Sequence, residues 1–355
     1  MQQKIKLESL GIYLPEKVVT MEELLQACRH RPRLDLERIT GVHERRVADG
    51  EYAADLAIKA AARALAMSRY KAQEIDVIIC TSISKHNAQD EFTLEPSTAV
   101  LVRKALGAKN ALVFDLVNAC AGMLTGIYVL QGLIRSGVVH RGMVVSGEQN
   151  LPLTWTATRE VRHRLDGQLA AFTLGDCGAA IILDIATNTS YGFHWLDLVT
   201  GAKHDHYCYS RPSSRGKGGI LVTKARGFQV KGNQHFPFYL KQALDGSGWS
   251  VDDVHHVIPH QVSVRAIKTG VKAVKRFMRV ELPDYFLCCA EKYGNTTTTS
   301  HFLALHEFML NGRIAKDHNV MLVSGASGIV ISHATFTLDE LPDRYRAHVG
   351  RGVQS

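Results

Sequence analysis

A long-range internal repeat is the feature that most limits the folds open to this chain. The apolar run at 76–79 returns at 253–257, and the run at 144–147 returns at 322–325. The two displacements agree within one position, because 253 − 76 = 177 and 322 − 144 = 178. A shared displacement indicates a duplicated unit, in which short apolar strands alternate with helices. The sequence therefore predicts an α/β protein with two pseudo-symmetric halves.

A length of 355 residues fits two α/β halves better than one. We place the halves at 1–185 and 186–342, with a solvated tail at 343–355. No apolar run is long enough to span a membrane, and the N-terminus lacks a signal-peptide stretch. The seven cysteines are odd in number and show no zinc-type spacing, which is typical of reduced thiols. We expect a cytoplasmic enzyme without a metal site.

Cys120 occupies the most informative position in the chain. The apolar, β-branched run 111–117 predicts a buried strand, and apolar residues at helical spacing follow from Gly122. Cys120 therefore falls where a strand turns into a helix. Backbone N–H groups and the helix dipole at such a position favour a thiolate, which is a strong nucleophile. A buried core cysteine is the commoner alternative for a single thiol.

Two further segments supply groups that a nucleophilic thiol needs. His260 ends a short apolar strand, and Asn295 lies in a glycine-containing turn before a helix. Histidine exchanges or donates protons near neutral pH, whereas the asparagine amide donates without titrating. The repeat maps Cys120 onto position 298, since 120 + 178 = 298, so the two turns are equivalent and should approach each other.

At this point the chain resembles the ketoacyl synthases of the type III class, in the thiolase superfamily, from about Lys4 to Leu338. The resemblance rests on short motifs in the expected order: Tyr13-Leu14-Pro15-Glu16, Thr40-Gly41-Val42-His43-Glu44-Arg45-Arg46, Ala119-Cys120-Ala121-Gly122, Gly175-Asp176, Pro259-His260-Gln261 and Gly294-Asn295-Thr296.

The resemblance implies a thiolase fold with five αβαβα layers and a homodimer. It implies that Cys120 is the acylated nucleophile, and that His260 and Asn295 stabilise the enolate of the second thioester. The backbone of Cys120 and the Ser327 loop are expected to hold the oxyanion. The substrates would be thioesters of acyl carrier protein or coenzyme A, and no metal or redox cofactor is expected.

One local source of the net charge of +8 is a predicted helix. Arg265, Lys268 and Lys272 follow a spacing that places them on one helix face, which begins five residues after His260. Such a face attracts anions, although most basic helix faces are simply solvated. The resemblance favours docking of acyl carrier protein here. Nucleic acid is not expected, because no motif or aromatic interleaving accompanies the charge.

Three positions depart from the ordinary type III synthase. Asp35 and Ile39 stand where a Trp and an Arg sandwich the coenzyme A adenine in that family. Glu95 stands 25 residues before Cys120, where a Phe reaches the partner subunit's acyl pocket. A carboxylate in an apolar tunnel is costly unless it is used, so Glu95 is a candidate general base.

The segment around Glu95 and the Gly325–Gly328 loop resemble a subgroup of this family. Its members are the head-to-head acyl-condensing enzymes of bacterial olefin biosynthesis and the α-pyrone and dialkylresorcinol synthases. We therefore predict a Claisen condensation of two acyl or β-ketoacyl thioesters through an acyl-Cys120 intermediate. Three alternatives remain: a 3-oxoacyl-ACP synthase III that condenses a primer with malonyl carrier protein, an acyltransferase of the same fold, and an inactive synthase partner.

Overall fold

The computed structural model describes residues 4–88, 91–279 and 286–352, which contain two mixed sheets of matching topology. The first sheet has the order β1 (Ile5–Tyr13), β9 (Cys177–Ile185), β8 (Gly142–Glu148), β4 (Val77–Cys80) and β7 (Leu112–Asp115). The second has the order β10 (Gly192–Thr200), β15 (Val330–Thr337), β14 (Asn319–Ala326) and β13 (His256–Pro259).

The pairing directions repeat between the two sheets. In each sheet the first two pairs are antiparallel, and the next pair, β8 with β4 or β14 with β13, is parallel. Phe286 bridges Val257 of β13 in parallel, at the place that β7 occupies in the first sheet. The predicted duplication is therefore confirmed in the strand order.

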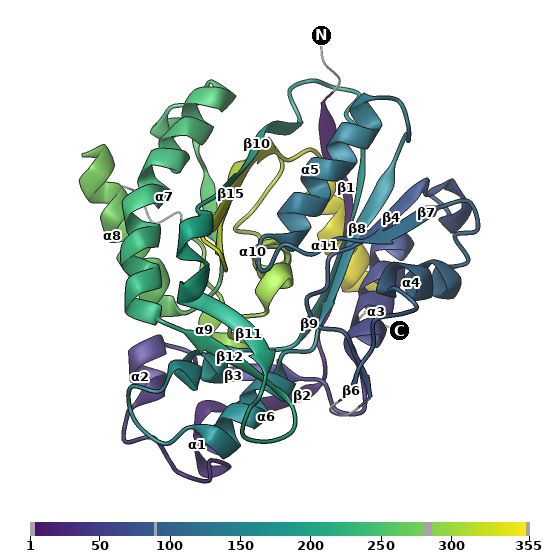
Figure 1. Cartoon of the computed structure of the whole chain (residues 1–355). Coiled ribbons are helices and arrows are strands. Elements are labelled where there is room, and N and C mark those ends of the chain that lie inside the picture. Colours follow the sequence, from purple (N-terminus) through teal and green to yellow (C-terminus); the bar gives the residue numbers. More distant parts are fainter. Residues whose placement is uncertain (1–3, 89–90, 280–285, 353–355) are drawn as a thin grey trace.

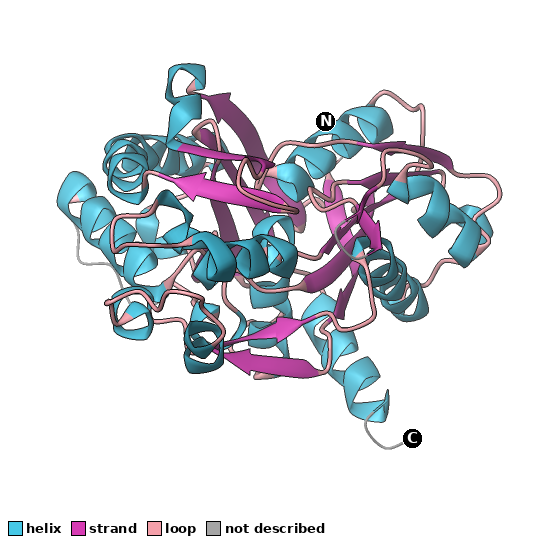
Figure 2. Cartoon of the chain, turned by 60° about the horizontal axis from the view of Figure 1, so that its bottom comes forward, coloured by secondary structure: helices cyan, strands magenta, loops and turns pink. Residues whose placement is uncertain are grey.

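Helices cover both sheets and fill the space between them. α3 (Ala53–Met67) and α4 (Thr98–Leu106) pack on the first sheet, and α7 (Ala225–Ser247) packs on the second with α8 (Val264–Met278) beside it. α5 (Gly122–Arg135) and α10 (Ser300–Leu310) lie between the sheets (Figures 1 and 2). This arrangement gives the five predicted layers.

The centre of the molecule is apolar because the strands are buried on both faces. All four residues of β4 are inaccessible to solvent, and the core extends across α5 and α10 into the second sheet. Glycine allows α3 to approach closely, since a Cβ on Gly147 would lie 2.0 Å from the carbonyl oxygen of Ala53. Burial of this continuous apolar surface is the main stabilising contribution.

Smaller elements surround the sheets. They are β2 (Lys17–Thr20), α1 (Met21–Gln26), α2 (Leu36–Thr40), β3 (Glu44–Val47), β5 (His86–Ala88), β6 (Glu91–Phe92), α6 (Leu151–Glu160), β11 (Cys208–Pro212), β12 (Gly219–Thr223), α9 (Ala290–Tyr293) and α11 (Leu341–Gly352). Short 3₁₀ turns are η1 (Ala72–Glu74), η2 (Gly167–Thr173), η3 (Ala202–Tyr207), η4 (Val251–Asp253) and η5 (Thr297–Thr299).

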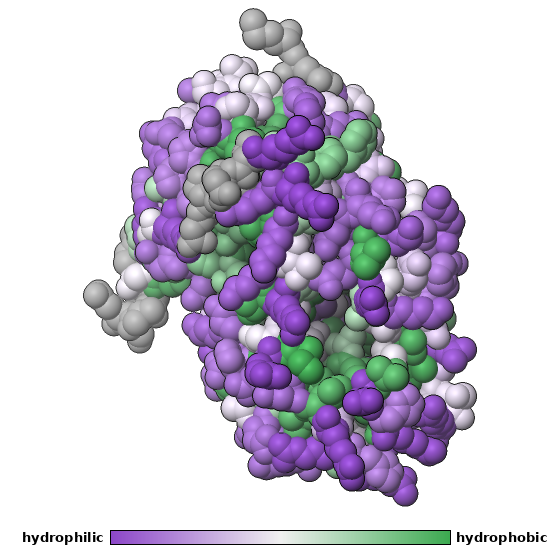
Figure 3. Space-filling view, turned by 90° about the vertical axis from the view of Figure 1, so that its left-hand side faces the viewer, coloured by the Kyte–Doolittle hydropathy of each residue, from purple (hydrophilic) through white to green (hydrophobic). Residues whose placement is uncertain are grey.

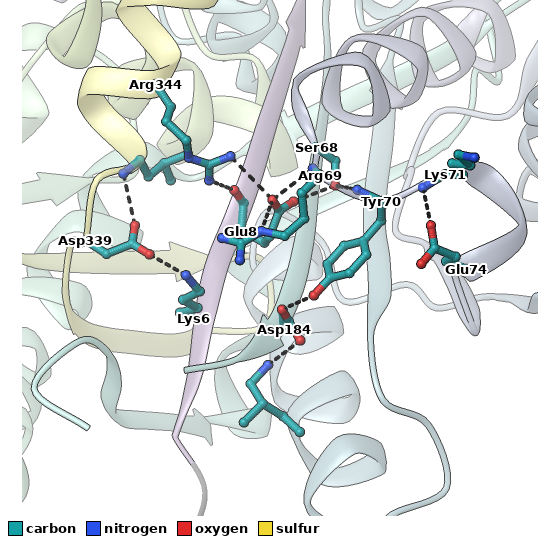
Figure 4. A network of polar contacts seen from close by, with 12 residues as sticks. Lys6, Glu8, Ser68, Arg69, Tyr70, Lys71, Glu74, Asp184, Asp339 and Arg344 are labelled. Carbon is teal, nitrogen blue, oxygen red and sulfur yellow. Dashed lines mark hydrogen bonds and ion pairs between the residues drawn. The ribbon is translucent and has the colours of Figure 1, made fainter. Parts of the chain in front are cut away.

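The described part of the predicted tail is not fully solvated. It belongs to α11, whose Tyr345 is buried. Glu8 is fully buried at a register shift in β1, where its carboxylate accepts from Ser68 and Arg69 and pairs with Arg344 of α11 (Figure 4). Aromatic and aliphatic side chains on one helix face, together with this buried carboxylate, hold the segment against the core. The sequence does not reveal this packing, because arginines are frequent in the segment and its few apolar residues form no long run.

Candidate active site

Cys120 lies in the turn between β7 and α5, as predicted, and its side chain is partly buried. The preceding residue, Ala119, has a φ of 44°, which is uncommon for a residue other than glycine. Thr297 has a φ of 53° and lies 178 positions later, since 297 − 119 = 178. The two halves therefore repeat the same strained turn, and α5 and α10 begin directly after it. Strain of this kind is often retained at functional sites.

Burial shifts the pKa of Cys120 in the direction opposite to the one expected from the helix N-terminus. Loss of water contact raises the pKa of the Cys120 thiol well above its usual range, with smaller contributions from Cys208 and Glu148. The hydrogen bond with its own backbone amide works in the other direction but is weaker. The prediction of a thiolate favoured by the helix is wrong for this conformation, because desolvation of the charged form dominates. Burial therefore favours the neutral thiol of Cys120 over the thiolate in this conformation.

His260 follows β13 and is only 5% exposed. Its Nδ1 lies 2.7 Å from the hydroxyl oxygen of Ser300, the first residue of α10, whereas its buried Nε2 has no partner among the described residues. Burial, and to a lesser degree His301, lowers the pKa of His260 to about 3. His260 is therefore a neutral imidazole with one nitrogen fixed and the other available.

Asn295 is held by its backbone and by its own amide. Its N–H donates to the carbonyl of Thr173 at 2.7 Å, and its side-chain Oδ1 accepts from the N–H of Thr297 at 2.9 Å. The second contact fixes the amide orientation, so Nδ2 is the donor end. Within the described part of the chain no group is paired with that Nδ2. A fixed, unpaired donor is the property required for binding an oxyanion.

The turns that carry these residues are in contact across the pseudo-twofold. A Cβ on Gly122 would lie 3.1 Å from the Cγ2 of Thr298, so the starts of α5 and α10 touch. Thr298 follows Asn295 by three positions, and Ser300 beyond it binds His260. The structure thus brings the elements that carry Cys120, His260 and Asn295 to one place, as the sequence predicted.

Glu148 at the end of β8 is a buried group that the sequence analysis missed. Its carboxylate accepts from the hydroxyl of Thr298 at 2.7 Å, from Ser146 at 3.0 Å, and from the N–H groups of Ile83 and Ser84. Burial raises the pKa of Glu148, and these donors oppose that shift. Glu148 joins the two halves directly beneath the active-site turns. Its only signal in the sequence is a charged residue at the end of a mostly apolar strand.

A hollow of about 460 Å³ opens beside Cys120. Its lining includes Ala119, Ser327, His206, Cys208 and Tyr209. The Ser327 hydroxyl donates to the carbonyl of Cys208, so the predicted oxyanion loop is tied to β11. The sequence indicated only a loop around 201–219, because short β-hairpins rich in polar residues carry no clear periodicity.

Glu95 lies on an exposed segment between β6 and α4. Phe92 and Leu94 on the same segment are 61% and 73% exposed. None of the contacts in the described residues joins Glu95 to Cys120. Asp35 and Ile39 are also exposed, and the Asp35 carboxylate caps α2 by accepting from the N–H of Arg38. The chain alone therefore does not complete a site that includes Glu95.

The predicted basic face is present on α8. Arg265, Lys268 and Lys272 are exposed, whereas Ile267 and Val274 on the opposite face are buried. Figure 3 looks onto the side of the molecule that carries α7 and α8, where hydrophilic side chains cover most of the upper part. Within the described residues no group of three or more His, Cys, Asp or Glu side chains is arranged to hold a metal ion. None of the described helices is both long and apolar enough to cross a membrane.

The fold and the Cys–His–Asn arrangement define a ketosynthase of the thiolase superfamily. Family models confirm this class: the one described as 3-oxoacyl-[acyl-carrier-protein (ACP)] synthase III matches residues 114–203, and its C-terminal counterpart matches residues 244–338. The chain is 31% identical over 334 residues to beta-ketoacyl-[acyl-carrier-protein] synthase III of Deinococcus deserti, covering 90% of this chain and 87% of that protein. It therefore belongs to the 3-oxoacyl-[acyl-carrier-protein] synthase III family, and it is an acyltransferase that forms carbon–carbon bonds by Claisen condensation.

Other relatives show how far the likeness extends. The chain is 28% identical over 344 residues to the synthase III of Clostridium perfringens, covering 94% of this chain and 99% of that protein. The crystal structure of the Aquifex aeolicus synthase III has a TM-score of 0.80 at 23% identity, covering 94% and 100% of the two chains. A variant of Xanthomonas campestris OleA has a TM-score of 0.81 at 22% identity, covering 95% and 97%. The fold is thus equally similar to both enzymes and does not separate them.

Proposed function

We propose that this chain is a 3-oxoacyl-ACP synthase III, the alternative that the sequence analysis left open. The curated relatives with which it shares 28% to 31% identity carry that name, and this support outweighs the head-to-head prediction. The observation that carries the proposal is the Nε2 of His260, which has no hydrogen-bond partner among the described residues. His260 follows β13, and Cys120 and Asn295 lie in the turns that meet across the two halves. A neutral donor and an amide donor suit an enolate oxygen.

The reaction proceeds in two stages. The Cys120 sulfur attacks an acyl thioester, the carrier thiol leaves, and the thiol proton passes to that leaving group. A malonyl thioester then loses carbon dioxide, and the resulting enolate oxygen accepts from His260 and Asn295. The carbanion attacks the acyl carbonyl, whose oxyanion binds backbone N–H groups of Cys120 and the Ser327 loop. The Cys120 sulfur leaves and regains a proton, which releases a β-ketoacyl thioester.

The tautomer of His260 supports this assignment. The Ser300 hydroxyl oxygen accepts from the N–H of Gln261 at 3.5 Å, and we assign its own proton to the contact with the Nδ1 of His260 at 2.7 Å. The ring proton then sits on Nε2, where it can be donated. A charged imidazolium is not required, because burial holds the pKa of His260 at about 3.

A homodimer completes the proposal. β7 is an edge strand of the first sheet, and Leu112 on it is 60% exposed. Val117 and Tyr128 are 58% and 51% exposed nearby in sequence. Apolar side chains at an open sheet edge favour pairing with a second copy. Sedimentation should show a dimer, and Leu112→Lys should shift it toward monomer; a wild-type monomer would contradict this part.

The carrier partner is assigned to the face of Arg265, Lys268 and Lys272 on α8. These side chains are exposed, and the two lysines follow Arg265 along the helix that begins just after the His260 segment. Their charge suits an acidic carrier protein. Coenzyme A is less favoured, because Asp35 and Ile39 replace the two residues that contact its adenine in the family. We place the enzyme in the cytoplasm, where its thioester substrates are made.

A head-to-head condensation is the second candidate, and Glu95 is the observation that favours it. The exposed segment with Phe92 and Leu94 is suited to enter an apolar pocket of the partner subunit, where Glu95 would remove the α-proton of a non-malonyl thioester. Such a reaction needs no malonyl group and releases no carbon dioxide.

One experiment decides between the two candidates. Acyl thioester is supplied with and without malonyl carrier protein, while acylation of Cys120 is followed by intact mass and product by carbon dioxide release. If the chain is a synthase III, product formation should require malonyl carrier protein and should change little in Glu95→Gln. The matched control Glu16→Gln, at another exposed glutamate, should behave in the same way. Turnover without malonyl carrier that is lost only in Glu95→Gln would establish the second candidate. Undiminished acylation in Cys120→Ala would contradict both.

A further inference from the structure

Three surface segments far apart in the sequence meet at the C-terminal end of α6. The N–H of Arg29 donates to the carbonyl of Thr158 at 2.9 Å, which places the α1–α2 loop there. Arg159 donates to the carbonyl of Lys217 at 3.2 Å, and Arg215 to the carbonyl of Glu160 at 3.2 Å, which place the β11–β12 turn beside it. Figure 1 shows α1, α6 and the β11–β12 hairpin together at the bottom of the molecule.

This junction is strongly basic. We define the basic platform as six exposed side chains of the three segments: Arg29, Arg33, Arg162, Arg164, Arg215 and Lys217. None of the six forms an ion pair with a carboxylate in the part of the chain that the structure describes. The neighbouring Glu160 is buried and bonded to Ser213, and Asp166 caps η2 through the N–H of Gln168. The platform is a major source of the net charge of +8.

The fold itself does not account for these charges. Cations near a helix C-terminus are favourable, and Arg215 uses one such carbonyl. Arg33, Arg162 and Arg164 form no side-chain hydrogen bond with the described residues. Clustered cations without partners repel one another, which lowers the stability of the folded state unless an anionic surface compensates.

An exposed leucine stands within this platform. Leu165 is 83% exposed and directly follows Arg162, His163 and Arg164 in the turn after α6. Val161 at the base of the turn is fully buried, and the Leu165 N–H donates to the His163 ring, so the tip is held outward from the core. An exposed leucine beside arginines matches the boundary between charged headgroups and acyl chains.

We propose that the basic platform adsorbs this enzyme to an anionic lipid surface, with Leu165 at the level of the upper acyl chains. Arginine pairs bidentately with phosphate and carboxylate oxygens, which anionic headgroups present in a plane. Each arginine near such a surface strengthens adsorption about fivefold. An acidic protein would also attract the charges, but it does not explain the leucine at the centre of the tip. Adsorption is independent of the condensation chemistry, since it involves none of the active-site residues.

The test measures binding of the full-length protein to vesicles by co-sedimentation. Vesicles of phosphatidylserine with phosphatidylcholine should bind the wild type, and pure phosphatidylcholine vesicles should not. Arg162→Gln with Arg164→Gln should weaken binding roughly 25-fold. Leu165→Ser should weaken it further, by an amount that persists when salt screens the charges. All variants change exposed side chains, so their thermal midpoints should not fall below that of the wild type.

The matched control is Lys268→Gln with Lys272→Gln, which removes the same charge from the α8 face. This control should retain vesicle binding. Absence of binding to the anionic vesicles, or equal losses in the two double variants, would overturn the proposal. Loss of carrier-dependent turnover in Arg162→Gln with Arg164→Gln, without vesicle binding by the wild type, would instead assign the platform to an acidic protein.

Discussion

Removal of the Ser300 hydroxyl should uncouple acylation from condensation. Ser300 is fully buried, and its oxygen lies 2.7 Å from the Nδ1 of His260. In Ser300→Ala this nitrogen loses its partner within a dry site, and the tautomer with the proton on Nδ1 competes with the one that donates from Nε2. Acylation of Cys120 does not need the Nε2 proton, whereas enolate stabilisation does.

The magnitude follows from the burial of both partners. Leaving a buried polar nitrogen unpaired costs about 1–3 kcal/mol. If the enolate loses stabilisation of about 1.4–2.7 kcal/mol, the condensation rate falls about 10- to 100-fold. The free energy of unfolding should fall by about 1–3 kcal/mol for the same reason. Acylation should change little.

The assay separates the half-reactions. Intact mass after rapid quenching gives the rate of Cys120 acylation, and β-ketoacyl product gives the rate of condensation. Ser9→Ala is the matched control, because the Ser9 hydroxyl on β1 is also buried but has no hydrogen-bond partner among the described residues. A wild-type condensation rate in Ser300→Ala, or the same loss in Ser9→Ala, would refute the reasoning.

Three further predictions address docking, stability and pH. Arg265→Glu should slow turnover of carrier-bound substrate at low salt, and the deficit should shrink near 1 M salt, where the Debye length is about 3 Å; an equal deficit at both salts would argue against charge-based docking. Glu8→Gln should lower the free energy of unfolding in urea by about 2 kcal/mol, because it weakens a buried carboxylate's pairing with partly exposed arginines. An unchanged denaturation midpoint would contradict that role. Burial lowers the pKa of His260 to about 3 and of His301 to about 4. The unfolded chain then binds more protons below pH 6.5, so each of these histidines should reduce stability by about 1.4 kcal/mol per pH unit between pH 6.5 and 4. Replacing His301 with Gln should flatten this acid limb, and an unaltered slope would exclude its contribution.

Much of the site was accessible from local patterns. Cys120 and His260 each stand at the end of an apolar run, where a strand gives way to a turn, whereas Asn295 lies in the turn that follows α9. The repeat placed the turns of Cys120 and Asn295 in equivalent positions. The basic face of α8 followed from spacing along one helix. Glu148 and the hollow lined by Cys208 were not predicted, because the residues around them come from segments that no spacing in the sequence relates. The prediction of a solvated tail beyond residue 342 failed for α11, since this helix packs against β1 and pairs with Glu8 at the opposite end of the chain.

The sequence by itself determined the duplicated α/β architecture, because strand periodicity and the 178-position repeat are signals contained in the chain. Together with the family resemblance it also predicted Cys120 as the nucleophile and His260 and Asn295 as its two donors. Only the tertiary structure decided the protonation states. Helix position alone favours a Cys120 thiolate, but burial shifts the pKa of Cys120 toward the neutral thiol and that of His260 toward the uncharged imidazole. It also decided which nitrogen of His260 is free, since that depends on Ser300 across the interface of the two halves. Desolvation and hydrogen bonding depend on every segment that surrounds a group, and that surrounding exists only after the chain has folded.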